Sequence, residues 1–254
     1  MDPQQRYRRH FTGLAHRGGS LEHFENSPSA FRHAAALGYD VIETDIQVSR
    51  DGTIYIFHDD DLDRTTTGHG RFHDKTDAEL DALTLKNGEP IPTLDTMLAA
   101  VPDVILNIDV KADSGIRPMA DYLNTHDCHD RICLASFSTK RLNAVRRLLN
   151  KPCHASGGQA DVLRLYLGAF GLPTGRPDII AAQVPTTAYG LDLVTPRFIK
   201  HCHKLDIAVH VWTIDDDAEM QRLISMGVDG IVTDRPTVLK DVTQRNGMTI
   251  APSS

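Results

Sequence analysis

The stretch that decides the fold runs from residue 41 to residue 59 and reads VIETDIQVSRDGTIYIFHD. Its first half has the pattern of a strand, in which Glu43 and Asp45 stand two residues apart. Side chains alternate between the faces of a strand, so we expect both carboxylates on one face. A turn at residues 50–52 and a second extended run then return His58 beside them. This group suits a divalent metal next to a general acid or base, although Glu-x-Asp alone also fits a solvated strand face.

Eight short β-like runs recur along the chain, and a helix-length segment follows most of them. They begin near Thr12, Asp40, Val104, Arg131, Cys153, Ile179, Ala208 and Gly230. Regular alternation of strand and helix is typical of a (β/α)8 barrel, and 254 residues is an ordinary length for one. We therefore predict an α/β protein in which residues 1–254 form a single TIM barrel domain.

Helix start and stop signals support this alternation. Ser27 followed by Pro28 resembles a capped helix start, and Gly38 follows the expected end. Similar starts are expected at Ser138, at Thr195-Pro196 and at Asp216, with a stop at Gly227.

One interval between strands is much longer than the others. It separates the runs near Asp40 and Val104 and contains a mostly polar segment. We interpret residues 53–92 as a hairpin plus insertion that lies over the barrel mouth. Because its few apolar residues are mainly Leu80, Leu83 and Leu85, it offers little surface for a lipid chain.

Composition excludes several classes of protein. The formal net charge of −7 disfavours a nucleic-acid partner and a basic membrane-binding face. No apolar run approaches the length of a membrane span, and the polar start MDPQQRYRRHFTG is unlike a secretory signal. The four cysteines form no CxxC pair and fit buried thiols in a reducing compartment, so the cytoplasm is the expected location.

Polar residues fall where the predicted strands end, which is where such barrels build their active sites. Glu43, Asp45 and Asp109 are expected on the inner faces of adjacent strands. Three carboxylates at close range repel one another, so a cation should compensate them, and oxygen ligands favour Mg or Ca. An ion pair with Lys111 is the alternative role for Asp109.

The remaining mouth residues suggest phosphate ester chemistry. His16 and His58 approach from different segments and can divide the acid and base roles, although a single histidine is more often structural. Arg17 and Lys111 supply positive charge for a phosphate. Trp212 is expected as a substrate wall or as barrel core, and Gln183 completes the predicted substrate-binding set.

At these residues the chain resembles the glycerophosphodiester phosphodiesterase family, within the phospholipase C-like phosphodiesterase superfamily. The matching motifs are HRGG at 16–19, ENS at 25–27, IETDIQVSRDG at 42–52, FHDDDLDRTTTGHG at 57–70, IPTLDTML at 91–98, NIDVK at 107–111, SFS at 136–138, VWTI at 211–214 and GIVTDRP at 230–236. The resemblance covers roughly residues 12–240, and as an ordered set the motifs are specific.

The resemblance implies cleavage of glycerophosphodiesters to glycerol 3-phosphate and an alcohol, with a cyclic phosphate intermediate. It implies that His16 and His58 are the acid and base, and that Glu43, Asp45 and Asp109 bind the metal. The chain departs from the family at Asp109, where the family usually has Glu.

Two other functions stay open at this point. One is lysophospholipase D or phospholipase C-like action on a lipid, and the other is a barrel that binds phosphodiesters without cleaving them. The expected partner is a small glycerophosphodiester, while the head group, the choice between Mg and Ca, and the oligomeric state are not specified by the sequence.

Overall fold

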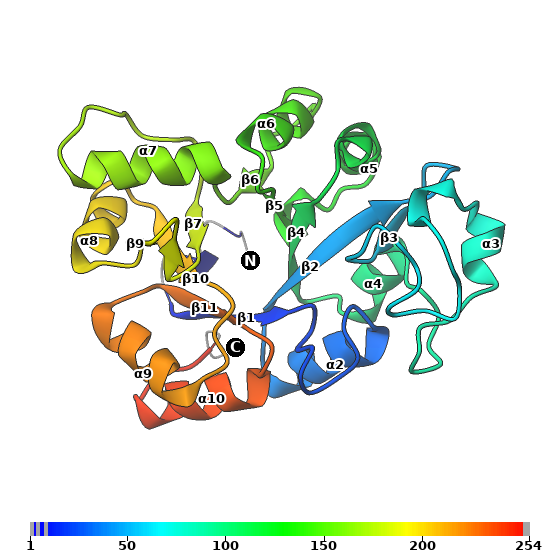
Figure 1. Cartoon of the computed structure of the whole chain (residues 1–254), viewed down its shortest axis with the longest axis horizontal. Coiled ribbons are helices and arrows are strands. Elements are labelled where there is room, and N and C mark those ends of the chain that lie inside the picture. The colour runs from blue at the N-terminus through cyan, green and yellow to red at the C-terminus, as the bar shows by residue number, and fades with distance from the viewer. Residues whose placement is uncertain (1–2, 4–5, 8–9, 251–254) are drawn as a thin grey trace.

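The computed structural model describes residues 3, 6, 7 and 10–250 and shows a TIM barrel (Figure 1). Its eight parallel strands are β1 (Thr12–His16), β2 (Val41–Val48), β4 (Ile105–Val110), β5 (Ile132–Ala135), β6 (His154–Ala155), β7 (Ala181–Val184), β10 (Ala208–Val211) and β11 (Gly230–Thr233). They pair in the order β6-β5-β4-β2-β1-β11-β10-β7, and a parallel bridge from Ser156 to Ala181 joins the two ends. The predicted fold is confirmed, and each predicted strand start lies within two residues of the observed one.

Helices surround the strands on the outside of the barrel (Figure 1). They are α2 (Pro28–Leu37), α4 (Leu94–Ala100), α5 (Ile116–Thr125), α6 (Thr139–Arg147), α7 (Gln159–Ala169), α8 (Pro196–Lys204), α9 (Asp217–Met226) and α10 (Pro236–Arg245). A shorter helix, α3 (Asp77–Asp81), lies away from the barrel, and single 3-10 turns occur at Phe72–Asp74, Asp113–Gly115 and His129–Arg131.

The predicted helix starts are confirmed because each capping side chain accepts a backbone hydrogen bond. Ser27, Ser138, Thr195 and Asp216 do so at the starts of α2, α6, α8 and α9. These bonds satisfy N–H groups that have no partner within the helix. Gly38 and Gly227 end their helices in the left-handed conformation, which glycine adopts without a steric penalty.

The inside of the barrel changes from apolar to polar along its axis. On β2 the inward series is Val41, then Glu43, then Asp45, because side chains two residues apart share a face. On β4 the paired series is Ile105, Asn107 and Asp109, each in register with its β2 counterpart. Below these layers an apolar cluster closes the barrel, and it includes Tyr7, Leu14, Cys133 and Ala208. The polar ends of the strands therefore converge at the barrel mouth.

The long interval after β2 begins as an antiparallel hairpin. Strand β3 (Ile54–Ile56) pairs with the end of β2, as the turn at residues 50–52 predicted. The rest of the segment packs around its own apolar cluster, formed by Tyr55, Phe57, Leu62, Phe72, Leu80, Leu85 and Ile91. It occupies one edge of the molecule in Figure 1, opposite α7 and α8.

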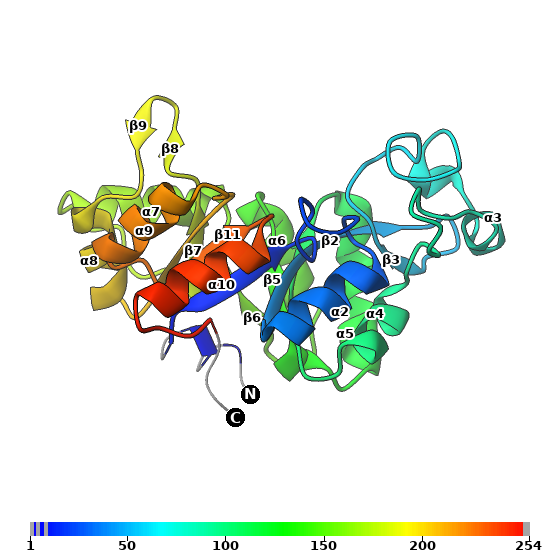
Figure 2. The same cartoon turned by 90° about the horizontal axis from the view of Figure 1, so that it is seen from below.

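Strand pairing around the barrel is least extensive between β6 and β7, and we call this junction the seam. Strand β6 has two residues, and backbone hydrogen bonds cross this seam from Gly157 N to Ala181 O (2.8 Å) and from Ile180 N to Ala155 O (2.9 Å). Beyond β7 the chain forms a second hairpin, β8 (Thr187–Ala188) and β9 (Leu191–Asp192). Figure 2 shows this hairpin projecting from the top of the molecule in that view.

All four cysteines are buried and free, as predicted. Within the described part of the chain, no helix is long and apolar enough to cross a membrane.

Phe198 tests how far the packing of α8 stabilises the barrel. Its side chain is fully buried between helix and strands, whereas Phe170, just after α7, is 57% exposed. Phe198→Ala should lower the free energy of unfolding by about 3–5 kcal/mol through the lost burial and the cavity left behind. Phe170→Ala, the matched control, should change it by less than about 1 kcal/mol in the same denaturant titration. Equal losses for the two variants would contradict this account of the core.

Candidate active site

Three neighbouring strands deliver the predicted acidic residues and one histidine to the mouth. Strand register places His16 beside Glu43 and Asp45 beside Asp109. The side chains of Asp45 and Asp109 are only 2% and 8% exposed. Because all these groups point inward at the carboxyl ends of strands, the structure brings them together as the alternation of the sequence predicted.

Two cations lie among these carboxylates. Lys111 Nζ is 2.9 Å from Asp45 Oδ1 and 3.3 Å from Asp109 Oδ2. Burial lowers the pKa of Lys111, but the charges of Asp45 and Asp109 outweigh this effect and raise it overall. Arg17 Nε lies 3.3 Å from Asp45 Oδ2. The ion pair between Asp109 and Lys111, which the sequence left as an alternative, is therefore present.

Glu43 carries the most perturbed carboxyl of the group. Burial raises its pKa, the charge of Asp45 raises it further, and the pKa reaches about 8. Burial also raises the pKa of Asp109, although Lys111 opposes the change. When all three carboxyls are ionised, they carry one more charge than Arg17 and Lys111 offset.

These carboxylates match the donor chemistry that a hard divalent cation needs. Asp45 Oδ2 and Asp109 Oδ1 are buried and accept no hydrogen bond, although Arg17 Nε lies 3.3 Å from Asp45 Oδ2. Carboxylate oxygens of this kind are the ligands that Mg and Ca prefer. Added positive charge would also stabilise Glu43 in its ionised form. Among the described residues, however, no three His, Cys, Asp or Glu side chains are gathered closely enough to form a ready-made metal site. The oxygen donors are chemically suited to the cation, but Lys111 lies between two of them.

Each predicted catalytic histidine is held by a carboxylate of its own. His16 Nδ1 is 2.7 Å from Asp234 Oδ1, which also accepts a bond from Ser20 Oγ at 2.6 Å. The other ring nitrogen of His16, Nε2, faces Glu43 Oε2 at 3.7 Å. Burial lowers the pKa of His16, but Glu43 and Asp234 outweigh burial and raise it. His58 Nδ1 is 2.6 Å from Asp59 Oδ1.

Arg64 connects the insertion to the barrel. It donates to both oxygens of Asp59 and both oxygens of Glu25, over distances of 2.6–3.0 Å. Glu25 also accepts a bond from Arg17 Nη1 at 3.1 Å. Burial raises the pKa of Glu25 and of Asp59, but Arg64 and its neighbours outweigh it, and both pKa values fall below their usual range. A chain of ion pairs therefore runs from His58 to Arg17.

The loop after β1 adopts an unusual backbone at two residues that are not glycine. Arg17 has φ of 51° and Asn26 has φ of 54°. Such conformations are uncommon outside glycine and persist where surrounding contacts enforce them. Thr44 Oγ1 donates to Asn26 Oδ1 at 2.8 Å, and a Cβ at Gly19 would meet Pro236 at 2.6 Å. The loop is thus locked against β2 and α10, which fixes Arg17 at the mouth.

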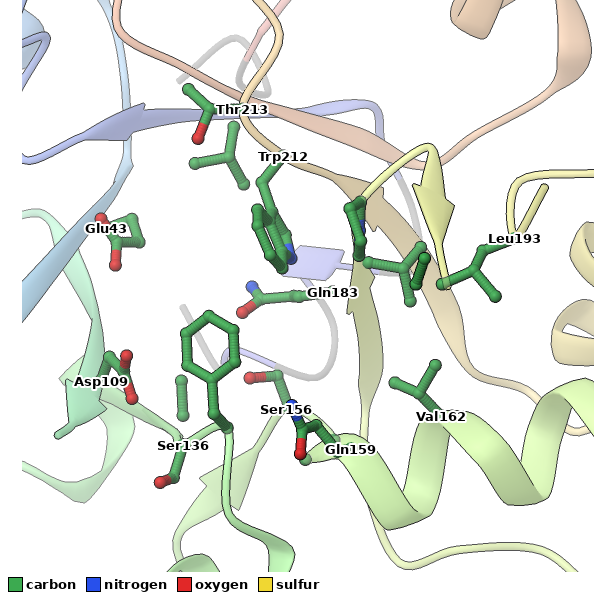
Figure 3. A pocket seen from close by; sticks show the side chains of 18 of the residues that line it. Glu43, Asp109, Ser136, Ser156, Gln159, Val162, Gln183, Leu193, Trp212 and Thr213 are labelled. Atoms are coloured by element: carbon green, nitrogen blue, oxygen red, sulfur yellow. The ribbon is translucent and has the colours of Figure 1, made fainter. Parts of the chain in front are cut away.

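The whole group opens into a cavity of about 830 Å³. His16, Arg17, Glu43, Asp45, His58, Asp109, Lys111, Gln183 and Trp212, all predicted from the sequence, line it. Gln183 Nε2 donates to Asn107 Oδ1 at 3.1 Å, and Trp212 packs edge to face on Phe137 with ring centres 5.6 Å apart. Figure 3 shows Trp212 and Gln183 between the acidic side chains and an apolar side.

Several residues of the site were not predicted from the sequence. Asp59 and Asp234 follow strand or hairpin ends next to predicted residues, and their side chains hold the histidines. Their positions beside predicted residues could have indicated a place at the mouth, but the sequence did not specify which side chain each would contact. Phe137 lies within the SFS motif but was not expected at the cavity.

The mouth of this TIM barrel holds two histidines, each contacted by a carboxylate, beside buried acids and fixed cations, and this combination suits an enzyme site for acid–base chemistry. Residues 16–238 match the model of the glycerophosphoryl diester phosphodiesterase family. The chain belongs to this family and is a phosphoric diester hydrolase.

Individual relatives agree with this assignment. "Probable glycerophosphodiester phosphodiesterase 2" of Mycobacterium tuberculosis is 36% identical over 242 residues, which cover 92% of this chain and 91% of the relative. Mouse "Lysophospholipase D GDPD1" is 26% identical, covering 90% of this chain and 84% of its own. A solved Oleispira antarctica phosphodiesterase in complex with the product sn-glycerol-3-phosphate superposes with a TM-score of 0.76. That structure is 23% identical and covers 92% of this chain and 96% of its own, and it supports the fold.

Arg64→Lys should weaken the connection between the insertion and the barrel. A lysine cannot reproduce the two-pronged contacts with Asp59 and Glu25, so His58 loses its fixed position. We expect kcat to fall about tenfold or more, since small misplacements of a reacting group are costly. The melting temperature should change little because the Arg64 side chain is 51% exposed.

Arg32→Lys is the matched control for this change. Arg32 is 57% exposed and pairs with Glu89 at 3.6 Å, outside the cavity. Its kcat should equal that of the unmodified protein. Unchanged kcat in Arg64→Lys would show that the contacts of Arg64 with Asp59 and Glu25 have no part in positioning His58.

Proposed function

We propose that the chain hydrolyses glycerophosphodiesters to sn-glycerol 3-phosphate and an alcohol in a metal-dependent reaction, with His16 and His58 as the acid and base. The observation that carries the proposal is the pairing of each histidine with its own carboxylate at one cavity. A carboxylate on Nδ1 fixes the tautomer and leaves Nε2 to exchange a proton with the substrate.

The cations and the aromatic wall would bind the rest of the diester. Arg17 and Lys111 line the cavity and offset phosphate charge, with the guanidinium suited to a two-pronged contact. Trp212 and Gln183 would form the wall beside the glycerol. Glu43, Asp45 and Asp109 would hold Mg or Ca, which when bound supplies positive charge to the phosphate and to a glycerol hydroxyl.

Two histidines suit a reaction in two displacement steps. In the first, one histidine takes the proton of the substrate's 2-hydroxyl as its oxygen bonds to phosphorus. The other histidine gives a proton to the departing alcohol oxygen, and a 1,2-cyclic phosphate forms. In the second step the roles exchange, as water opens the ring and the bond from phosphorus to the 2-oxygen breaks. Each step conserves protons, and the pair returns to its starting state.

Two histidines that can transfer protons favour hydrolysis over a barrel that only binds phosphodiesters. Binding alone requires Arg17 and Lys111 but gives no role to two histidines that are oriented by carboxylates. A small-molecule diester is the proposed partner, and the cytoplasm is the proposed location.

Product analysis of His16→Ala and His58→Ala tests the proposal. With glycerophosphocholine, ³¹P NMR should show glycerol 3-phosphate, with the cyclic phosphate as a transient species. Each variant should stay folded and lose at least about a hundredfold in rate, which is the usual contribution of a positioned acid or base. A variant that keeps near-normal turnover would remove that histidine from the proposed roles.

Chelation tests the metal. Exhaustive chelation should abolish turnover, and Mg or Ca should restore it. Asp109→Asn removes one anionic ligand and should raise the metal concentration needed for half-maximal rate, and calorimetry should show correspondingly weaker metal binding. Full turnover with verified absence of metal would refute metal dependence, and unchanged metal affinity in Asp109→Asn would assign Asp109 to its ion pair with Lys111.

A further inference from the structure

We propose that the hollow between α7 and α8 is a second binding site, separate from the barrel mouth, that takes a phosphate-bearing anion. Helices α7 and α8 pack side by side on the outside of the barrel (Figure 1). A cavity of about 510 Å³ opens between the end of α7 and one face of α8, and we call it the α7–α8 hollow. None of its lining residues belongs to the cavity at the mouth, so this inference goes beyond the proposed function.

Helix α8 supplies the charge of the hollow. Four of its residues line the hollow at spacings of three and four positions, and they are Arg197, Lys200, His201 and Lys204. Side chains at this spacing share one face of a helix, so the cations point the same way. The buried side chains of α8, such as Phe198, belong to the core and lie on its other face. The cationic face is therefore left over to meet a ligand.

The cations of the hollow lack compensating negative charge. No Asp or Glu is among the residues that line the hollow, although the chain as a whole has a net charge of −7. Within the part of the chain that the structure describes, Arg197, Lys200 and Lys204 form no ion pair, and the guanidinium of Arg197 lies 5.0 Å from the ring centre of Phe170. Like charges on one helix face repel one another, and a bound anion would relieve that repulsion.

Two glycines shape the hollow at the end of α7. A Cβ on residue 168 would lie 2.5 Å from His201 Nε2, so a larger residue than Gly168 would push His201 away. Gly171 has φ of 90°, and its N–H donates to Gly168 O at 2.9 Å, which satisfies that carbonyl within the chain. Among the described residues, His201 Nε2 is shielded from solvent and has no hydrogen-bond partner. The hollow therefore contains a polar group that the protein itself leaves unsatisfied.

A phosphate group matches this chemistry. Its oxygens accept several hydrogen bonds, and Arg and Lys side chains are well suited to donate them. A phosphate monoester carries a charge of about −1.5 to −2 at neutral pH, so it can meet more than one cation at once. Because Arg197, Lys200 and Lys204 are exposed, each contact is weak, and we expect half-saturation at about 1 mM. The volume lies within the range for small-molecule sites, so a free phosphate and a lipid phosphate head group both fit.

Amide NMR with inorganic phosphate tests the site. Gly168 and Gly171 line the hollow, whereas Gly157 and Gly158 line the mouth, so one spectrum reports on both places. Phosphate added at constant ionic strength should shift the amide signals of Gly168 and Gly171 with saturation, and chloride at the same ionic strength should not. Arg197→Gln combined with Lys204→Gln should weaken this binding by at least about fivefold, because two charge contacts are lost.

Lys140→Gln combined with Arg147→Gln is the matched control. Helices α6 and α8 both have nine residues, and each pair of changes removes exposed cations at the second and ninth positions. Lys140 and Arg147 line neither the hollow nor the mouth. Phosphate affinity at Gly168 and Gly171 should therefore equal that of the unmodified protein. Equal weakening in the two double variants would reduce the effect to overall charge and overturn the inference.

Vesicle sedimentation separates a free phosphate from a lipid head group. Equimolar phosphatidic acid and phosphatidylcholine present a phosphate monoester on a surface, and phosphatidylcholine alone is the neutral reference. Binding to the acidic vesicles that the α8 variant loses and the α6 control keeps would identify a lipid head group as the ligand. Saturable shifts at Gly168 and Gly171 without vesicle binding would identify a free phosphate. Absence of both responses, or shifts confined to Gly157 and Gly158 without vesicle binding, would overturn the inference.

Discussion

Asp45 and Asp109 stand side by side on adjacent strands, and the rest of the site depends on compensating these two buried carboxylates. Removing two negative charges from water is unfavourable unless positive charge or hydrogen bonds replace the lost hydration. Lys111 meets both, and Arg17 approaches one, yet a buried oxygen on each remains without a hydrogen bond. Burial raises the pKa of Glu43, and the charge of Asp45 raises it further. The two aspartates stabilise a cation at the mouth and raise the pKa of Lys111.

The contacts that hold Arg17 in place link distant parts of the chain. Arg17 has a left-handed backbone and pairs with Glu25, which in turn binds Arg64 of the insertion. Arg64 also binds Asp59, whose other contact is His58. Because the arginines and carboxylates of this series are charged, they orient one another more strongly than neutral hydrogen bonds would. The insertion has a small apolar core of its own. His58, its residue in the cavity lining, is nevertheless oriented through contacts with the barrel loop after β1.

The sequence predicted the barrel because each strand and helix carries local signals, such as Ser27 with Pro28 and Gly38. The same local rule placed Glu43, Asp45 and Asp109 on inner faces, since a two-residue spacing fixes the side of a strand. Asp234 contacts His16 from 218 residues away in the chain, so this pairing could not be read from the sequence, whereas Asp59 contacts its own neighbour, His58. The apolar side of the cavity was not predicted, for a related reason. Strands of two residues, as in the β8–β9 hairpin, are too short for alternation to be read, and Leu163 looks like any helix-surface leucine.

The seam between β6 and β7 has a dynamic consequence. Backbone amides exchange with solvent through local openings, and an opening needs less free energy where fewer hydrogen bonds must break. Strand β6 has two residues, while β2 and β4 pair over six positions on the far side of the barrel. The wall between β6 and β7 is therefore expected to open locally at a lower cost in free energy. Glu43, Asp45 and Asp109 lie instead on β2 and β4, where six paired positions make such an opening more costly.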